Sequence, residues 1–229
     1  MRKPVIFFAL IALFACTQSP KQPVLIDTET FTGRADGKKV ELFTLQNKNG
    51  VVAQITNFGG RVVSLWVPDK KGNFEDIVTG YQTFAGYLNS KEIYYGALIG
   101  RYGNRIAKGQ FTLNDTVYSL VQNNDENHLH GGTKGFNDVV WDASQTDGQT
   151  LVLTYTSPHM EEGYPGNLDV KVQYKLHPFE SEIIPYFIYP YTIDLTLLPE
   201  RVALSEMIEI NGREWYHIET EPDYFESDG

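Results

Sequence analysis

Cysteine and basic residues are both scarce in this sequence. Cys16 is the one cysteine among 229 residues, so no disulfide can form within the chain. The 19 lysines and arginines face 29 aspartates and glutamates, which gives a formal net charge of −10. Nucleic acids and anionic lipid surfaces are bound by clusters of Lys and Arg. This charge balance therefore argues against both as direct partners, whereas a neutral small molecule is compatible with it.

Long helical patterns and repeats are also missing from the sequence. No window shows a sustained helical spacing of apolar side chains, and no motif recurs at a fixed period. This argues against a doubly wound parallel sheet, whose strands alternate with helices. The 20 glycines and 11 prolines are spread in short turn-like clusters, which favours many short strands.

The first residues are typical of a targeting segment. Arg2 and Lys3 precede an apolar run over residues 5–15. A membrane-spanning helix needs about 20 apolar residues, so this run is too short to span a membrane, but its length suits a secretory signal. The run ends Leu-Phe-Ala-Cys at Cys16, as in a bacterial lipobox. We therefore expect a signal peptide with lipobox over residues 1–16, lipidation of Cys16, and an exported lipoprotein that faces the periplasm and touches the membrane only through its lipid. The alternative is an ordinary signal peptide with an incidental cysteine.

Short strands are predicted along most of the remaining sequence. After a tether and lead-in over residues 17–39, apolar runs bounded by turn residues predict strands over 40–45, 51–56, 61–67, 110–113, 116–121, 139–144, 150–156 and 168–176. Residues 83–88 are expected to form a turn or two of helix. Many short strands without alternating helices predict an all-β fold, an antiparallel β-sandwich or barrel, over residues 40–176.

Residues 177–229 differ in character from the segment before them. Prolines recur in a stretch rich in aromatic and branched residues, at Pro178, Pro185, Pro190 and Pro199. Because proline cannot donate to a β-ladder, we expect edge strands and loops there. The chain then closes with an acidic stretch that we expect to be frayed.

One motif offers an arginine suited to binding oxygen atoms. Residues 100–109 read Gly-Arg-Tyr-Gly-Asn-Arg-Ile-Ala-Lys-Gly, with Arg105 between Asn104 and Ile106 just before a predicted strand. A scaffold can hold a guanidinium at such a place, and its fork of donors suits two oxygens at once. Taken in isolation, the motif favours a solvated turn.

A second motif offers histidines. Residues 127–132 read Asn-His-Leu-His-Gly-Gly, and in an extended chain His128 and His130 point to one face. Zinc requires three or four ligands, and the other histidines show no matching spacing, so we expect no metal site. His130 precedes two glycines, whose missing side chains leave room for a ligand. It is therefore placed for hydrogen bonding or proton transfer.

Two further stretches are more easily explained by structure than by chemistry. Phe136 and Trp141 are more typical of a core than of a sugar-stacking platform. Glu161 and Glu162 invite comparison with a glycosidase acid/base pair, but neighbouring side chains on an extended chain diverge. A solvated turn is the favoured interpretation.

Taken together, these motifs resemble those of the aldose 1-epimerase (galactose mutarotase) family. The resemblance runs from residue 40 to 176 and rests on residues 57–60, 100–109, 127–132, Gly135, Phe136, Trp141 and 161–168. It implies a large antiparallel β-sandwich of the galactose mutarotase-like supersandwich type, with a sugar cleft and no cofactor. Family members open the sugar ring and reclose it with the anomeric hydroxyl on the other face, so the implied partner is a small-molecule aldose.

The resemblance also implies roles for individual residues. Arg105 and Asn104 match the family's sugar-binding arginine and its neighbour. His130 matches the first active-site histidine, which bonds to the substrate near its ring oxygen and is our candidate catalytic residue.

The sequence departs from the family pattern after residue 176. Leu197 and Leu198 stand where the family has an Asn-His pair whose histidine is the usual acid, and no counterpart follows for the sugar-binding aspartate or the glutamate base. We therefore expect a sandwich that is incomplete at its C-terminus and an impaired epimerase. The alternatives are a non-catalytic carbohydrate-binding lipoprotein and a truncated gene product without activity.

Overall fold

The computed structural model describes residues 19–177, 204–210 and 213–216. The expected signal peptide with Cys16 lies outside these residues, and so do Leu197 and Leu198. Within the described part of the chain, no helix is long and apolar enough to cross a membrane.

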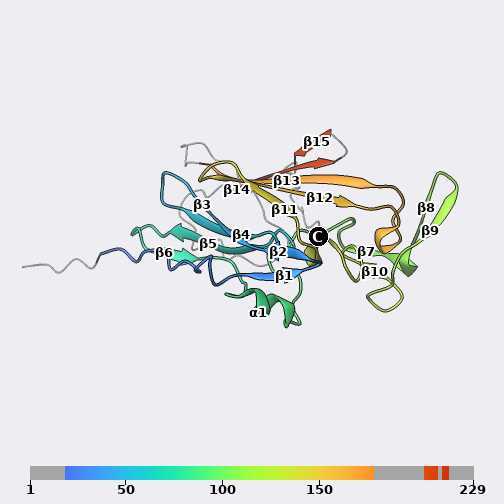
Figure 1. The fold of residues 1–229 in the computed structure, drawn as a ribbon, viewed down its shortest axis with the longest axis horizontal. Helices are drawn as coiled ribbons and strands as arrows, with labels where there is room; N and C mark the ends of the chain where they lie inside the picture. The colour runs from blue at the N-terminus through green and yellow to red at the C-terminus, as the bar shows by residue number, and fades with distance from the viewer. Residues whose placement is uncertain (1–18, 178–203, 211–212, 217–229) are drawn as a thin grey trace, which may run out of the picture.

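Two antiparallel sheets lie one above the other and form the body of the molecule (Figure 1). One sheet has the strand order β3-β4-β5-β6, with β3 (Leu42–Gln46), β4 (Val52–Thr56), β5 (Val62–Pro68) and β6 (Phe74–Asp76). The other has the order β11-β12-β13-β14-β15, with β11 (Asp142–Gln145), β12 (Thr150–Ser157), β13 (Leu168–Leu176), β14 (Leu204–Ile210) and β15 (Arg213–Tyr216). The predicted all-β antiparallel sandwich is confirmed.

Smaller elements lie around the two sheets. Three two-stranded ribbons pair β1 (Gly33–Ala35) with β2 (Lys38–Val40), β7 (Arg105–Ile106) with β10 (His128–Leu129), and β8 (Gln110–Leu113) with β9 (Thr116–Ser119). The helix α1 (Phe84–Leu88) lies where a helical turn was predicted, and the Thr83 hydroxyl caps it by accepting from the Gly86 N–H at 3.1 Å. Short 3₁₀ turns occur at Ala107–Gly109, Phe136–Asp138 and Glu161–Gly163.

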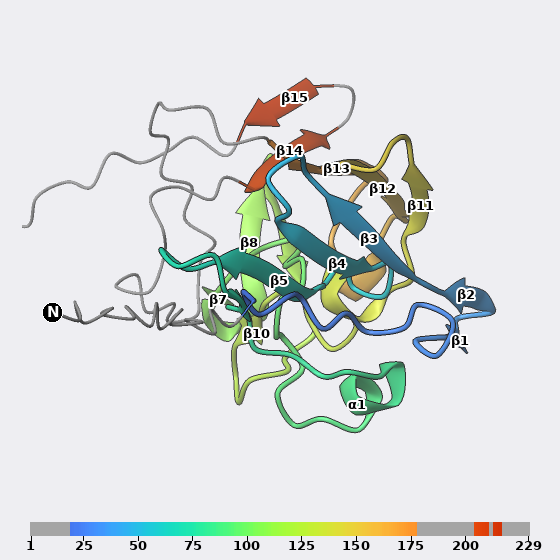
Figure 2. The same cartoon turned by 90° about the vertical axis from the view of Figure 1, so that its left-hand side faces the viewer.

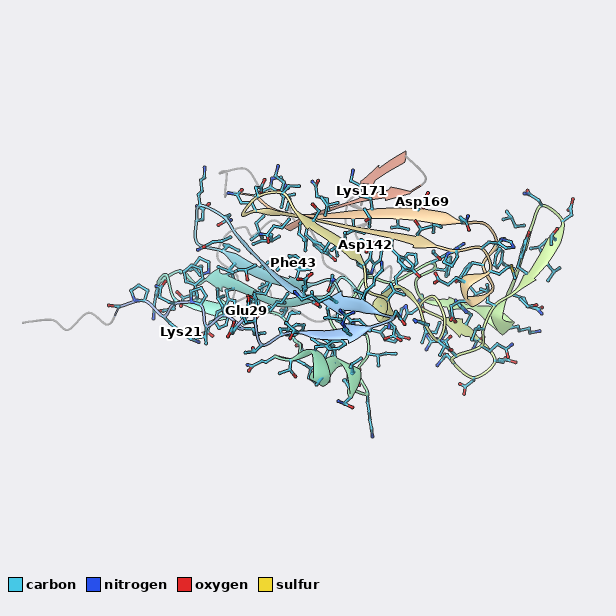
Figure 3. The ribbon with its side chains drawn as sticks, in the orientation of Figure 1. Lys21, Glu29, Phe43, Asp142, Asp169 and Lys171 are labelled. Carbon is cyan, nitrogen blue, oxygen red and sulfur yellow. The ribbon has the colours of Figure 1, made fainter. Side chains whose placement is uncertain are left out.

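Side chains from both sheets meet in one apolar core. Along β13, Val170 and Val172 are buried, whereas Asp169 and Lys171, which alternate with them, face away from the core (Figure 3). Phe43, also labelled in Figure 3, packs against the core from β3. The opposite sheets contribute fully buried side chains such as Leu45, Ala53, Ile55, Leu151 and Leu153. Burial of this set supplies most of the driving force for the sandwich.

The other face of the first sheet is covered by α1 and by the segment that leads into the sheet (Figures 1 and 2). Phe31, Phe84 and Tyr87 pack there in a second cluster of buried side chains. The buried amide of Gln54 in β4 receives the Ile26 N–H at 2.9 Å and donates to the Ile26 carbonyl at 2.7 Å. The lead-in is therefore part of the folded unit, which begins well before residue 40.

The observed strands differ from the predicted ones where local pattern is weak. The strand expected over 40–45 is interrupted at Glu41. Its N–H donates to Oδ1 of the Asn57 side chain at 2.8 Å and not to a carbonyl of a neighbouring strand. The strand β6 and the two-residue strands β7 and β10 were not predicted, because so short a segment shows no periodicity. By contrast, β13 spans the residues predicted for it, 168–176. Of the tail predicted as edge strands and loops, β15 lies at the sheet edge and β14 lies inside the sheet.

Candidate functional site

The pairing of β7 with β10 brings the arginine and histidine motifs together. Arg105 lies opposite Leu129, and Ile106 lies opposite His128, in antiparallel register. His130 follows directly after β10, and Asn104 directly precedes β7. The three predicted site residues Asn104, Arg105 and His130 therefore lie at one end of this ribbon.

Asn104 and His130 are joined by two reciprocal hydrogen bonds. The His130 N–H donates to the Asn104 carbonyl, and the Asn104 N–H donates to Nδ1 of the His130 ring, each at 3.0 Å. Both residues have a positive φ, 62° for Asn104 and 52° for His130. A backbone N–H can only donate, so Nδ1 must accept and carries no proton. The neutral ring is thereby fixed as the tautomer protonated on Nε2.

The surroundings of His130 favour its neutral form. The pKa of His130 lies below its usual 6.5, chiefly because burial penalises the charged ring and also because Arg105 is a nearby positive charge. The Tyr94 ring contacts the imidazole edge-on, with centroids 4.8 Å apart. Near neutral pH, His130 is therefore a hydrogen-bond donor through Nε2 and a weak source of protons.

The Arg105 guanidinium is held from one side and left accessible on the other. Its Nε–H donates to Oδ1 of Asn124 at 2.8 Å, and Nη1 donates to Oδ1 of Asn104 at 3.4 Å. The side chain is exposed, and no acceptor for Nη2 is found among the described residues. Arg105 can therefore present donors to two oxygen atoms of a ligand.

The second histidine of the motif has a structural role. His128 is fully buried, and its Nδ1–H donates to the Val121 carbonyl at 2.6 Å while Nε2 accepts from the Tyr164 hydroxyl at 2.8 Å. The strand β10 ends at Leu129 and His130 has a left-handed backbone, so the extended chain that would place both histidines on one face is not present. Among the residues that the structure describes, no group of three or more His, Cys, Asp or Glu side chains is arranged to hold a metal ion.

Arg101, the other arginine of the first motif, clamps the loop that follows β12. Its guanidinium donates to carbonyls of Ser157, Pro158, Pro165 and Gly166 at 2.9 to 3.1 Å and to the Ser157 hydroxyl at 2.7 Å. Burial lowers the pKa of Arg101 from its usual value. The two arginines of this motif thus differ in role, because the guanidinium of Arg101 is bonded to the protein's own loop, whereas that of Arg105 is accessible.

The acidic pair is not a solvated turn. Glu161 is half-buried and accepts hydrogen bonds from the hydroxyls of Tyr155, at 2.5 Å, and Ser157. Glu162 is half-buried as well, and its Oε2 accepts from the Thr133 N–H at 2.8 Å. Both carboxylates therefore organise the loops beside the site.

The glycines after His130 are required by close packing. Gly131 has φ 92°, and a Cβ there would lie 1.5 Å from the Gly100 carbonyl oxygen. The same carbonyl receives the Phe136 N–H at 3.2 Å. Phe136 in turn packs edge-on against the buried Trp141, at 5.4 Å between centroids, so the predicted core role of this pair is confirmed. The space beside Gly131 is therefore filled by the Gly100 carbonyl, so the expectation that its missing side chain leaves room for a ligand is wrong.

Three site residues were missed from sequence. Asn123 and Asn124 lie in a polar run before His128, and their side chains bond to the turn that carries His130 and to Arg105. Tyr94 lies against His130 from a distant part of the chain. The run of asparagines was a usable signal, since asparagine side chains often bond to nearby backbone. Nothing local indicated Tyr94.

The sequence model of the family described as aldose 1-epimerase matches residues 41–181, more than half of the chain. The chain belongs to the aldose 1-epimerase family. Among curated relatives, the galactose mutarotase of Bos taurus is 43% identical over 137 residues, covering 60% of this chain and 39% of the relative. The aldose 1-epimerase of Escherichia coli strain K12 is 32% identical over 147 residues, covering 62% and 40%.

Solved structures of family members share the fold. The aldose epimerase homologue from C. elegans superposes with a TM-score of 0.57 at 26% identity, covering 60% of this chain and 42% of that chain. The galactose 1-epimerase from Lactobacillus acidophilus NCFM gives 0.55 at 27% identity, covering 63% and 42%. The chain spans about 40% of the length of the curated relatives it matches.

Proposed function

We propose that this protein binds an aldohexose such as galactose or glucose through Arg105, Asn104 and His130, and acts as an aldose 1-epimerase of low turnover. The observation that carries the proposal is the pair of hydrogen bonds between Asn104 and His130. They hold the imidazole beside the Arg105 guanidinium, close enough for the arginine to lower the pKa of the histidine.

The chemistry of the site suits a neutral sugar. Ring and hydroxyl oxygens are good acceptors, and the Arg105 guanidinium can donate to two of them at once. The Nε2–H of His130 supplies a further donor, and family resemblance implies that it is directed toward the ring oxygen. Because the imidazole stays neutral, binding needs no charge on the ligand.

Proton transfer is the weaker part of the proposed activity. Exchange of anomers requires a base for the C1 hydroxyl and an acid for the ring oxygen. His130 is a poor acid near neutral pH, and Glu161 and Glu162 are engaged by the scaffold. Within the described ranges no other side chain is assigned to transfer these protons, and each proton-transfer group that a site lacks lowers its rate by roughly 10²–10⁴-fold. We therefore expect saturable sugar binding with slow turnover.

Optical rotation of freshly dissolved α-D-galactose tests the activity. With the wild-type chain we expect a small acceleration over the rate in buffer, while a titration on the same sample shows galactose binding; both are lost in His130→Ala. Binding without any acceleration would support a non-catalytic carbohydrate-binding protein instead. A large acceleration that disappears in His130→Ala would contradict low turnover and mean that this chain supplies its own acid and base. Neither binding nor acceleration from a cooperatively unfolding sample would support a product without activity and refute the proposal.

We also propose that the protein is exported and lipid-anchored through Cys16, on the strength of the apolar run and lipobox in the sequence. In a bacterial host, the wild-type chain is expected in the membrane fraction and Cys16→Ala is expected to be absent from it. Radiolabelled fatty acid should mark only the wild type. An unlabelled wild-type chain in the soluble fraction would refute the anchor.

A further inference from the structure

We infer that Asn123 is a positioning residue for His130: its side chain fixes the turn that aims the imidazole at the ligand. The inference rests on the proposed function for its meaning, since a histidine needs aiming only if it meets a ligand. The geometry on which it stands is independent of that function.

The side-chain amide of Asn123 bonds to residues on both sides of His130 in the sequence. Its Oδ1 accepts from the Leu129 N–H at 2.7 Å, and its Nδ2 donates to the carbonyls of Leu129 at 2.9 Å and Gly132 at 2.8 Å. The turn itself is closed by the Gly132 N–H, which donates to the Leu129 carbonyl at 3.0 Å. Three side-chain bonds thus hold both ends of a turn whose middle residues are His130 and Gly131.

The backbone at this turn needs such support. His130 has φ 52°, a left-handed conformation that costs a non-glycine residue energy and persists where its surroundings enforce it. Its ring and its backbone N–H are both held by the Asn104 backbone, and the two ends of its turn, Leu129 and Gly132, are held by the Asn123 side chain. The direction of Nε2 therefore depends on two residues: Asn104, which bonds through its backbone, and Asn123, which bonds through its side chain.

An amide is the group that fits this place. The two protons of Nδ2 meet two carbonyl oxygens, and Oδ1 meets an N–H, so both ends of the amide are used. Asn123→Asp keeps the size and the acceptor, but sets a carboxylate oxygen against the carbonyls of Leu129 and Gly132. Asn123→Ala loses all three bonds without adding charge.

Asn47 supplies a matched control. Its side chain also makes three hydrogen bonds to backbone, from Nδ2 to the His177 carbonyl at 2.8 Å and to Oδ1 from the N–H groups of Asn49 and Val51 at 3.0 and 3.1 Å. It lies in the turn between β3 and β4, toward the other end of the molecule from β7 and β10 (Figure 1). Asn47→Asp therefore adds the same carboxylate away from the turn of His130, with one donor bond lost and both acceptor bonds kept. Asn47→Ala loses all three bonds and is the matched control for Asn123→Ala.

The test combines nitrogen-15 NMR of the His130 imidazole with galactose titration, on the full chain and on samples that unfold cooperatively. In the wild type we expect the spectrum of a ring protonated on Nε2. In Asn123→Asp we expect the His130 signals to shift or broaden and galactose affinity to fall about tenfold, the factor of one net hydrogen bond. In Asn47→Asp the signals and the affinity should match the wild type.

The alternatives give distinct results. An unchanged His130 spectrum in folded Asn123→Asp, or equal changes in both variants, would overturn the inference. If Asn123→Asp does not fold, Asn123→Ala takes its place; if neither folds while Asn47→Asp does, Asn123 supports the whole fold and the inference is wrong. A wild type that binds no galactose refutes the proposed function alone, because the imidazole spectra still decide whether Asn123 positions the ring.

Discussion

At the scale of single residues, one backbone contact decides which ring nitrogen of His130 carries the proton, because the Asn104 N–H donates to Nδ1 and leaves the proton on Nε2. Asn104, Arg105 and His130 were predicted as site residues from the family resemblance, and Arg105 and His130 also from the hydrogen bonds that their side chains can make. The protonation of His130 depends on a backbone N–H that approaches Nδ1 through a fold-determined contact. The same limit explains why Arg101 and Arg105, which look alike in sequence, differ so much in the structure.

The lowered pKa of His130 predicts a specific pH dependence. The pKa of His130 in the folded chain lies below the usual 6.5. As the pH falls below 6.5, His130 therefore binds a proton more readily in the unfolded chain than in the folded chain. The stability contributed by neutral His130 is therefore present above pH 6.5 and is lost as the pH falls through the folded pKa. Titration of the imidazole by NMR should give a pKa below 6.5, and urea unfolding should weaken more steeply with acid in the wild type than in His130→Gln. A folded pKa at or above 6.5 would contradict the geometry.

At the scale of elements, the long strands followed from local pattern and the short ones from long-range contacts. The strand β13 matched its prediction because nine residues give a clear alternation of buried and less buried side chains. The ribbon of β7 and β10, which builds the site, has two residues in each strand and exists through their pairing and the turns beside it. Sequence reasoning could place the motifs but could not bring them together without the family resemblance.

The clamp of Arg101 on the loop after β12 offers a test at this scale. Arg101→Lys keeps the charge but replaces a planar fork with a point donor, so several of the carbonyls at Ser157, Pro158, Pro165 and Gly166 lose their partner. We expect the free energy of unfolding to fall by about 2 kcal/mol, together with faster hydrogen exchange in the 157–166 loop. The matched variant Arg34→Lys changes an exposed arginine with one carbonyl bond and should be nearly neutral. Equal effects would argue against the clamp.

At the scale of the whole molecule, the two sheets, together with the helix and lead-in that cover the outer face of the first sheet, form one folded unit. Strand spacing predicted an antiparallel sandwich or barrel, since many short strands must bury one face against another, and the family resemblance narrowed this to a sandwich. The part played by the lead-in before residue 40 was not predictable, because its contacts with Gln54 and Phe84 are set by tertiary structure. The match to relatives covers about 60% of the chain, and the site residues all fall within it.

Truncation of a core side chain should affect the whole unit cooperatively. Leu153 of β12 is fully buried between the sheets, so Leu153→Ala is expected to lower the free energy of unfolding by about 3 kcal/mol through lost burial and a cavity. Leu113 of the projecting β8–β9 hairpin is 48% exposed, and Leu113→Ala should change it by less than about 0.5 kcal/mol. Urea denaturation followed by fluorescence measures both. A small loss from Leu153→Ala would mean that the two sheets do not share one core.

The central claim is that Arg105 and its neighbours bind an aldohexose, and galactose titration by calorimetry tests it most directly. The account predicts saturable binding by the wild-type chain, at least about tenfold weaker binding by Arg105→Ala because a charge-assisted donor is lost, and unchanged binding by Arg34→Ala, an exposed arginine of β1. Binding that survives Arg105→Ala, or no binding by a folded wild-type chain, would contradict it.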